Sequence, residues 1–207
     1  MLAGTGSDVG KSILAAAFCR ILKQDGYHPA PFKAQNMALN SYATPEGLEI
    51  GRAQAVQAEA AGVPCHTDMN PLLLKPSSEH TSQVVLLGKP IGDRNAYEYF
   101  RKEGREELRK VVNESYNRLA TRYNPIVMEG AGSISEINLR DVDLVNMPMA
   151  KHAGADVFLV ADIDRGGVFA SVYGSILLQT PEERSLIKGI IINKFRGDIR
   201  LFESGIK

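Results

Sequence analysis

The stretch Gly4–Ser12 reads Gly-Thr-Gly-Ser-Asp-Val-Gly-Lys-Ser and leads directly into an apolar helical pattern. Small residues let the backbone curl so that successive N–H groups point at phosphate oxygens, and the following helix adds its positive dipole end. In such a loop Lys11 reaches the β- and γ-phosphates and the Ser12 hydroxyl ligates Mg²⁺. Five residues separate Gly4 from Gly10, so a plain glycine-rich turn is the alternative. The residues predicted to hold the nucleotide phosphates are Gly6, Ser7, Asp8, Val9, Gly10, Lys11 and Ser12.

Beyond this loop, apolar residues recur at helical spacing in some segments and in short continuous runs in others. Gly and Pro separate these segments, as breakers of regular structure do. The pattern predicts helices over 11–24, 51–61 and 95–123 (the last broken near Gly104), strands over 30–34 and 83–87, and a long loop over 35–50.

Three later runs, 126–128, 157–161 and 189–192, are almost wholly apolar. Strands that are apolar on both faces belong to a parallel sheet covered by helices, and strands separated by helical patterns are typical of a doubly wound domain. We therefore predict an α/β fold of the P-loop NTPase type, with a mostly parallel sheet and helices on both faces.

The length of the chain, 207 residues, suits a single domain, because domains usually have ~100–200 residues. Only three residues precede Gly4, fewer than a full first strand needs, and the last residues contain neither a closing strand nor a cap. We expect residues 1–207 to be one domain cut from a longer protein and lacking part of its first strand.

The composition excludes several classes of protein. Lys plus Arg number 24, as do Asp plus Glu, so no global field attracts nucleic acid or an anionic membrane. No apolar run approaches the ~18 residues that cross a bilayer, and no signal peptide opens the chain. Two cysteines form no disulfide framework, and Cys19 is predicted to be a buried thiol. We expect a cytoplasmic protein without nucleic-acid or membrane partners.

Two polar residues follow apolar runs at positions where open α/β sheets bind ligands. Glu129 comes after 126–128 and precedes small residues; in a P-loop protein such an acid usually holds Mg²⁺, although it could instead cap a helix. Asn193 follows 189–192, and its amide matches the N6/N7 edge of adenine. An ordinary turn Asn is the alternative.

Further polar groups lie at two other expected strand ends. Asp162, Asp164 and Arg165 precede a Gly-Gly pair, which suggests contacts with substrate or phosphate, or else a salt-bridged turn. Lys33 could neutralise a transferring phosphoryl group, and the amides after it could hydrogen-bond a polar substrate.

In combination, these motifs resemble the cobyric acid synthase family, whose N-terminal synthetase domain is similar in fold to dethiobiotin synthetase. The likeness covers essentially all 207 residues. Besides the glycine-rich loop, the blocks that carry it are 31–41, 49–54, 69–71, 73–76, 129–133, 136–140, 162–169 and 192–198.

The resemblance implies an ATP- and Mg²⁺-dependent enzyme of cobalamin biosynthesis. It would convert side-chain carboxylates of adenosylcobyrinic acid a,c-diamide into amides through acyl phosphates, giving adenosylcobyric acid. Nitrogen would come from glutamine through a separate C-terminal glutaminase domain. Neither Cys19 nor Cys65 lies in a strand-to-helix elbow suited to a nucleophile, so this chain alone should not hydrolyse glutamine. Relatives with this fold often pair, which implies a homodimer.

The resemblance also implies roles for individual residues. The predicted catalytic residues are Lys11, Lys33, Asp162 and Asp164. The predicted Mg²⁺ ligands are Ser12, Glu129 and Glu49, with Asp8 as the other candidate for the second carboxylate. The predicted substrate contacts are Gln35, Asn36, Asn40, Ser41, Asn138 and Arg165.

Two other functions are compatible with the glycine-rich loop. One is a dethiobiotin synthetase-like ligase that activates a different carboxylate. The other is a nucleotide-switch ATPase of the partitioning type, but those proteins carry a second lysine near the start of the loop. Gly6 occupies that position here, which favours the synthetase.

Overall fold

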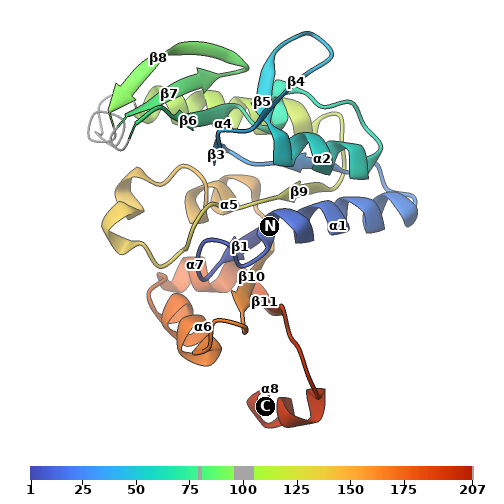
Figure 1. Cartoon of the computed structure of the whole chain (residues 1–207), viewed down its shortest axis with the longest axis vertical. Coiled ribbons are helices and arrows are strands. Elements are labelled where there is room, and N and C mark those ends of the chain that lie inside the picture. Colours follow the sequence, from blue (N-terminus) through green and yellow to red (C-terminus); the bar gives the residue numbers. More distant parts are fainter. Residues whose placement is uncertain (79–80, 96–104, 207) are drawn as a thin grey trace.

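Parallel strands form the centre of the computed structural model, which describes residues 1–78, 81–95 and 105–206 (Figure 1). β1 (Leu2–Gly4), β10 (Val157–Asp162) and β11 (Ile187–Asn193) pair in that order. β2 (Ala30–Phe32) pairs in parallel with β9 (Ile126–Met128). A parallel bridge between Leu2 and Glu129 joins the two groups, so the carboxyl ends of these strands meet at one edge. The predicted parallel sheet is confirmed.

Helices connect and cover these strands, as the alternation of patterns predicts. α1 (Lys11–Gln24) packs on β1, β2 and β9, and α6 (Val168–Leu177) packs on β10. α2 (Arg52–Ala61) packs on α1 and β2. α5 (Met147–Ala153) contacts both α4 (Arg105–Ala120) and α7 (Pro181–Leu186). The α/β fold class is confirmed.

A second, smaller sheet lies beside the parallel strands and was only partly expected. Its order is β3-β6-β7-β8, with β3 parallel to β6 and the other pairs antiparallel. Its strands are β3 (Gln35–Met37), β6 (Leu72–Pro76), β7 (Thr81–Leu86) and β8 (Lys89–Asn95), and a hairpin of β4 (Ser41–Ala43) and β5 (Glu49–Gly51) adjoins it.

The prediction of a long loop over 35–50 is therefore wrong at β3, β4 and the start of β5. These strands are short and largely polar, so no apolar alternation marks them, and β3 is ordered by pairing with β6. The helix expected over 95–123 is corrected at its ends: Asn95 belongs to β8, and the described helix, α4 (Arg105–Ala120), stops before 123. The predicted break near Gly104 lies outside the described residues.

The core is apolar and contains one cysteine. Cys19 of α1 is fully buried with Leu2, Phe32 and Met128, and burial raises the pKa of its thiol to about 12. The prediction of a buried free thiol at this position is confirmed. Within the described part of the chain, no helix is long and apolar enough to span a membrane.

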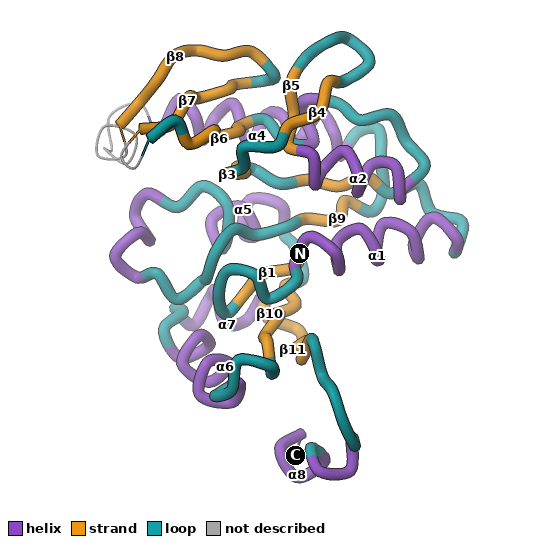
Figure 2. The backbone as a smooth tube through the Cα atoms, viewed as in Figure 1, coloured by secondary structure: helices purple, strands orange, loops and turns teal. Residues whose placement is uncertain are grey.

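The smaller helical elements complete the chain. They are η1 (Thr67–Met69), η2 (Ile137–Val142), η3 (Ile199–Leu201) and α8 (Glu203–Ile206). Figure 2 shows the backbone after β11 leading away from the sheet to η3 and α8. There Phe202 stacks on Phe169 of α6, with ring centroids 5.3 Å apart.

Candidate functional site

The glycine-rich loop connects the end of β1 to the first turn of α1. Gly10 has φ 100°, in the left-handed region, at the helix N-cap. A Cβ at this position would lie 2.2 Å from Asn193 Nδ2, so only glycine fits there. This strand–loop–helix arrangement is the one predicted. The N-terminus of the 14-residue helix α1 lines a cleft.

Lys11 is buried beside the loop and points across it. Its Nζ donates hydrogen bonds of 2.8 Å to the carbonyl oxygens of Gly6 and Gly132. Burial, followed by the nearby charge of Lys33, lowers the pKa of Lys11 to about 8. The structure thus holds a lysine in a desolvated position where an anionic ligand would stabilise its charge.

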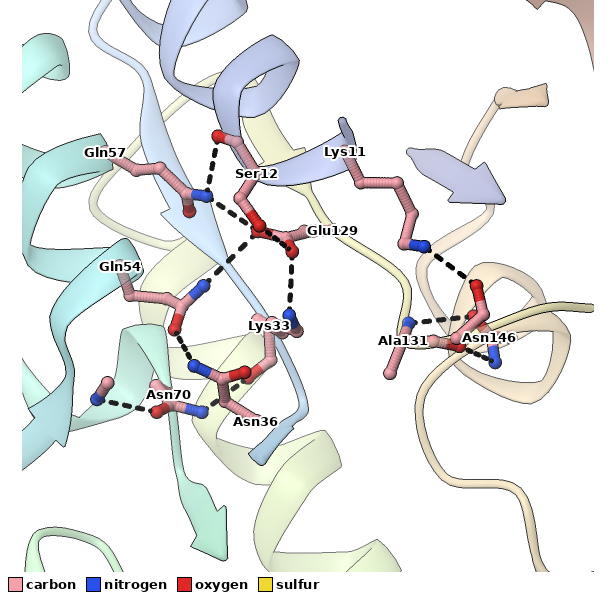
Figure 3. A network of polar contacts seen from close by, with 12 residues as sticks. Lys11, Ser12, Lys33, Asn36, Gln54, Gln57, Asn70, Glu129, Ala131 and Asn146 are labelled. Atoms are coloured by element: carbon pink, nitrogen blue, oxygen red, sulfur yellow. Dashed lines mark hydrogen bonds and ion pairs between the residues drawn. The ribbon is translucent and has the colours of Figure 1, made fainter. Parts of the chain in front are cut away.

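Glu129 lies just beyond β9 and is 2% exposed. Its Oε1 accepts hydrogen bonds of 2.7 Å from Ser12 Oγ and from Lys33 Nζ. The predicted residues Ser12, Lys33 and Glu129 therefore meet at one point, although they are far apart in the sequence (Figure 3). The carboxylate contacts side chains here, rather than capping a helix.

Two glutamines that sequence reasoning did not select complete this cluster. Gln57 Nε2 donates to Glu129 Oε2 at 2.6 Å, and Gln54 Nε2 donates to the same oxygen at 3.3 Å. Asn36 Nδ2 donates in turn to Gln54 Oε1 at 3.0 Å. Gln54 belongs to a block that carries the family resemblance, but a neutral amide on a helix offers no sequence signal of this contact.

Asn70 and Asn146 are two further amides that sequence reasoning missed. Asn70 Nδ2 donates to the Lys33 carbonyl oxygen at 3.1 Å, and its Oδ1 accepts from the Gly51 N–H. Asn146 exchanges two hydrogen bonds with the backbone of Ala131. The bonds of Asn70 tie the backbones of Lys33 and Gly51 together, and those of Asn146 fix the loop that follows Glu129.

A cleft of about 740 Å³ opens over this cluster. It runs from the glycine-rich loop past Lys33 to the loop between β9 and α5. The predicted site residues that line it are Ser7, Asp8, Gly10, Lys11, Ser12, Lys33, Gln35, Asn36 and Glu129. Its size suits a nucleotide together with part of a second substrate.

Asp162 lies outside the lining of this cleft, at the end of β10. Its Oδ2 accepts a 2.7 Å hydrogen bond from Lys194 Nζ and lies 3.4 Å from Arg165 Nε. The bond from Lys194 lowers the pKa of Asp162 below its ordinary value. Asp164 donates its backbone N–H to Asp162 Oδ1. The geometry is that of the salt-bridged turn, the alternative considered for these residues.

The end of β11 is tied to the glycine-rich loop. Asn193 Nδ2 donates to the Val9 carbonyl oxygen at 2.8 Å, and Lys194 Nζ donates to that of Asp8 at 2.7 Å. Asn193 is therefore beside the glycine-rich loop, and one N–H of its amide is bound to the protein; the predicted contact with adenine stays a prediction.

The other predicted residues are not brought to the cleft. Glu49 of β5 pairs with Lys75 Nζ at 2.6 Å, which lowers the pKa of this carboxylate, and it does not line the cleft. The same is true of Asn40, Ser41, Asn138 and Arg165. Among the described residues, no group of three or more His, Cys, Asp or Glu side chains could hold a metal.

The residues that are present fit Mg²⁺ nonetheless. Ser12 Oγ and Glu129 Oε1 are hard oxygen ligands 2.7 Å apart, beside the glycine-rich loop. Mg²⁺ is usually bound through one or two protein oxygens, with phosphate oxygens and water as its remaining ligands. One carboxylate and one hydroxyl therefore suffice when a nucleotide supplies the rest.

A glycine-rich loop, its buried lysine and a strand-end acid beside the helix serine define a P-loop nucleotide-binding protein. Residues 1–207 match the family model described as the CobQ/CobB/MinD/ParA nucleotide binding domain. The chain belongs to this family.

Comparison with curated proteins finds closely similar relatives. A cobyric acid synthase of Bacteroides fragilis (strain YCH46) and one of Phocaeicola vulgatus are each 86% identical over 207 residues, all of this chain. One of Parabacteroides distasonis is 67% identical over 206 residues, 99% of this chain. The chain spans 42% of the length of each of these relatives.

Proposed function

We propose that this chain is the ATP-dependent synthetase part of a cobyric acid synthase, which amidates corrinoid carboxylates. The observation that carries the proposal is the meeting of Lys11, Lys33, Ser12 and Glu129 at one cleft, in a chain 86% identical to enzymes with that name. The substrate would be adenosylcobyrinic acid a,c-diamide and the product adenosylcobyric acid.

The proposed chemistry begins by activating a carboxylate, because a carboxylate does not react with amines. A substrate oxygen attacks the γ-phosphorus of ATP, the bond to the β–γ bridging oxygen breaks, and ADP leaves. Ammonia then attacks the acyl carbon, phosphate leaves with the electron pair of the C–O bond, and the proton lost by nitrogen passes to the departing phosphate. No side-chain nucleophile is needed.

The residues of the cleft suit this reaction, because it brings two anions together. Lys11 would bind the β- and γ-phosphates, and Lys33, 2.7 Å from Glu129, would neutralise charge on the transferring group. When bound at Ser12 and Glu129, Mg²⁺ would supply further positive charge. Gln35 and Asn36 also line the cleft and would contact the substrate.

Several predicted roles change in this proposal. Glu49, Asn40, Ser41, Asn138 and Arg165 do not line the cleft and are left out of the site. We assign Asp162 and Asp164 to anchoring the loop rather than to chemistry. Asn193 is kept as the adenine contact, through Oδ1 and the second N–H of its amide, because the bond to Val9 uses one N–H of Nδ2.

Further partners belong to the proposal as well. The part of the relatives that this chain does not span would hydrolyse glutamine and supply ammonia. A homodimer follows from analogy with relatives of this fold, and a cytoplasmic location follows from the two free cysteines. A nucleotide-switch ATPase is the second candidate, because the matching family description also includes MinD and ParA.

The test is to incubate the chain with ATP, Mg²⁺ and adenosylcobyrinic acid a,c-diamide, and to measure the corrinoid by mass spectrometry. With ammonium salt at raised pH we expect amides to form and ATP to be consumed; with glutamine as the nitrogen source we expect none. Lys11→Ala is the inactive control. A rate of ATP hydrolysis that is unchanged by the corrinoid but raised by a protein or DNA partner would favour the switch ATPase.

A further inference from the structure

Two buried glutamines on one face of α2 point at the acid of the cleft. Gln54 is 0% exposed and Gln57 is 1% exposed, and residues three apart lie on the same face of a helix. A buried amide costs free energy unless it is hydrogen-bonded, so two of them side by side call for an explanation.

The hydrogen bonds divide the Glu129 carboxylate into two halves. Both glutamine Nε2 atoms donate to Oε2, at 2.6 Å from Gln57 and 3.3 Å from Gln54. Ser12 and Lys33 donate to Oε1. The amides therefore fix one oxygen and orient the other toward the glycine-rich loop (Figure 3).

Gln57 makes a second contact that Gln54 does not. Its Nε2 also donates to the carbonyl oxygen of Ser12 at 3.2 Å, which ties α2 to the first turn of α1. Its Oε1 is buried and has no hydrogen-bond partner within the part of the chain that the structure describes.

The charge of the cluster is balanced before any ligand arrives. Lys33 and Glu129 cancel each other, and the two glutamines add no charge. A divalent cation entering alone would meet one carboxylate that already has four donors. A triphosphate at Lys11 would supply the missing negative charge and oxygen ligands.

We propose that Gln57, assisted by Gln54, is a positioning residue that orients Glu129 and keeps its surroundings neutral, so that Mg²⁺ binds only together with the nucleotide. The proposal rests on the proposed function as far as Mg²⁺ and ATP are concerned. It does not depend on the corrinoid.

The first test removes the Gln57 amide and measures ATP affinity by calorimetry, with Mg²⁺ and with EDTA. Partners of a metal ligand typically contribute 10- to 100-fold to metal affinity, so Gln57→Leu should lose that much affinity for MgATP and little for metal-free ATP. Gln54→Leu should lose less, because its bond to Glu129 is longer. Equal losses in both conditions, or none, would overturn the proposal.

The second test keeps the size of the side chain and adds a charge. Gln57→Glu places a second carboxylate beside Glu129, so the nucleotide-free variant should melt at a lower temperature than the parent. Mg²⁺ or Mn²⁺ alone should raise the Tm of this variant and leave the Tm of the parent unchanged. Gln24→Glu, at an exposed position of α1, is the matched control and should behave like the parent.

Two results of the second test would contradict the inference. One is a Gln57→Glu variant whose Tm is not raised by divalent cations, and the other is a parent whose Tm is raised by Mg²⁺ without nucleotide. A parent that fails to bind MgATP would instead overturn the proposed function, so the two failures are distinguishable.

Discussion

Glu129 and Asp162 occupy comparable places in the fold and have contrasting surroundings. Each stands at the carboxyl end of a buried parallel strand, β9 for Glu129 and β10 for Asp162. Glu129 is held by one cation, one hydroxyl and two amides, and it lines the cleft. Asp162 is held by two cations, Lys194 and Arg165.

The comparison shows that the side chains around a strand-end carboxylate determine whether it serves a ligand site or anchors a loop. The Glu129 group pairs one carboxylate with one cation and neutral donors, so its net charge is zero. The Asp162 carboxylate faces two cations, so its group carries net positive charge and has no need of a further cation. Lys194 also binds the Asp8 carbonyl oxygen, so the Asp162 group anchors the outer side of the glycine-rich loop.

The largest effect is expected for Glu129→Gln. Loss of a preorganised charge in the cleft should lower turnover by roughly 100- to 1000-fold. Lys33 would remain buried without its partner, so the free energy of unfolding should fall by about 3 kcal/mol. The double variant Lys33→Met/Glu129→Gln should regain stability but not turnover. Normal turnover with a lowered Tm would mean that Glu129 is structural, as we argue for Asp162.

Lys11→Ala should weaken ATP binding by roughly 10- to 100-fold, the contribution of hydrogen bonds to a charged group. Because Lys11 is partly desolvated in the nucleotide-free protein, its removal should not lower the Tm. Calorimetry of ATP binding and a melting curve test both statements. Unchanged ATP affinity would contradict the assignment of the glycine-rich loop.

Asp162→Asn should have a modest effect, a two- to fivefold loss of ATP affinity, because Lys194 and Arg165 are partly exposed and such pairs contribute about 1 kcal/mol or less. The loss should shrink further in high salt. A loss of turnover as large as that of Glu129→Gln, at unchanged ATP affinity, would restore the catalytic role first predicted for Asp162.

The smallest effect is a proton linkage. With a pKa of about 8, Lys11 is about half protonated at pH 8 in the nucleotide-free protein, and bound phosphate should raise that pKa. ATP binding at pH 8 should therefore take up about half a proton, measurable as a dependence of calorimetric heat on buffer ionisation. In Lys11→Met this uptake should vanish.

The same lowered pKa should make the free energy of unfolding depend on pH. The pKa of Lys11 is lower in the folded chain, about 8, than its ordinary 10.5. The unfolded chain therefore binds more protons between these values, and this residue makes stability rise from pH 8 to 10.5. Unfolding of Lys11→Met should lack that contribution, whereas Asp162→Asn should retain it. A parent and Lys11→Met with the same pH slope would contradict the lowered pKa.

The fold was predictable from the sequence where local pattern is sufficient. The helix over 11–24 and the apolar runs that became β9, β10 and β11 were predicted, because helical periodicity and continuous apolar runs are properties of neighbouring residues. β3 to β5 were not predicted, because three-residue polar strands depend on partners such as β6, 37 residues away at Gln35 and Leu72.

The site divides in the same way. Lys11 and Ser12 follow from the chemistry of the glycine-rich loop, and Glu129 from its place after an apolar run. That Gln54 and Gln57 hold Glu129 was decided by the tertiary structure, since 75 and 72 residues separate them from it. From the sequence Glu49 is as good a candidate for a metal ligand as Glu129, but in the structure β5 places it beside Lys75, with which it forms an ion pair. The pattern of burial and the chemistry of the glycine-rich loop depend on residues that are adjacent in the sequence. The partners of a charged side chain depend instead on which distant helices and strands the fold brings together.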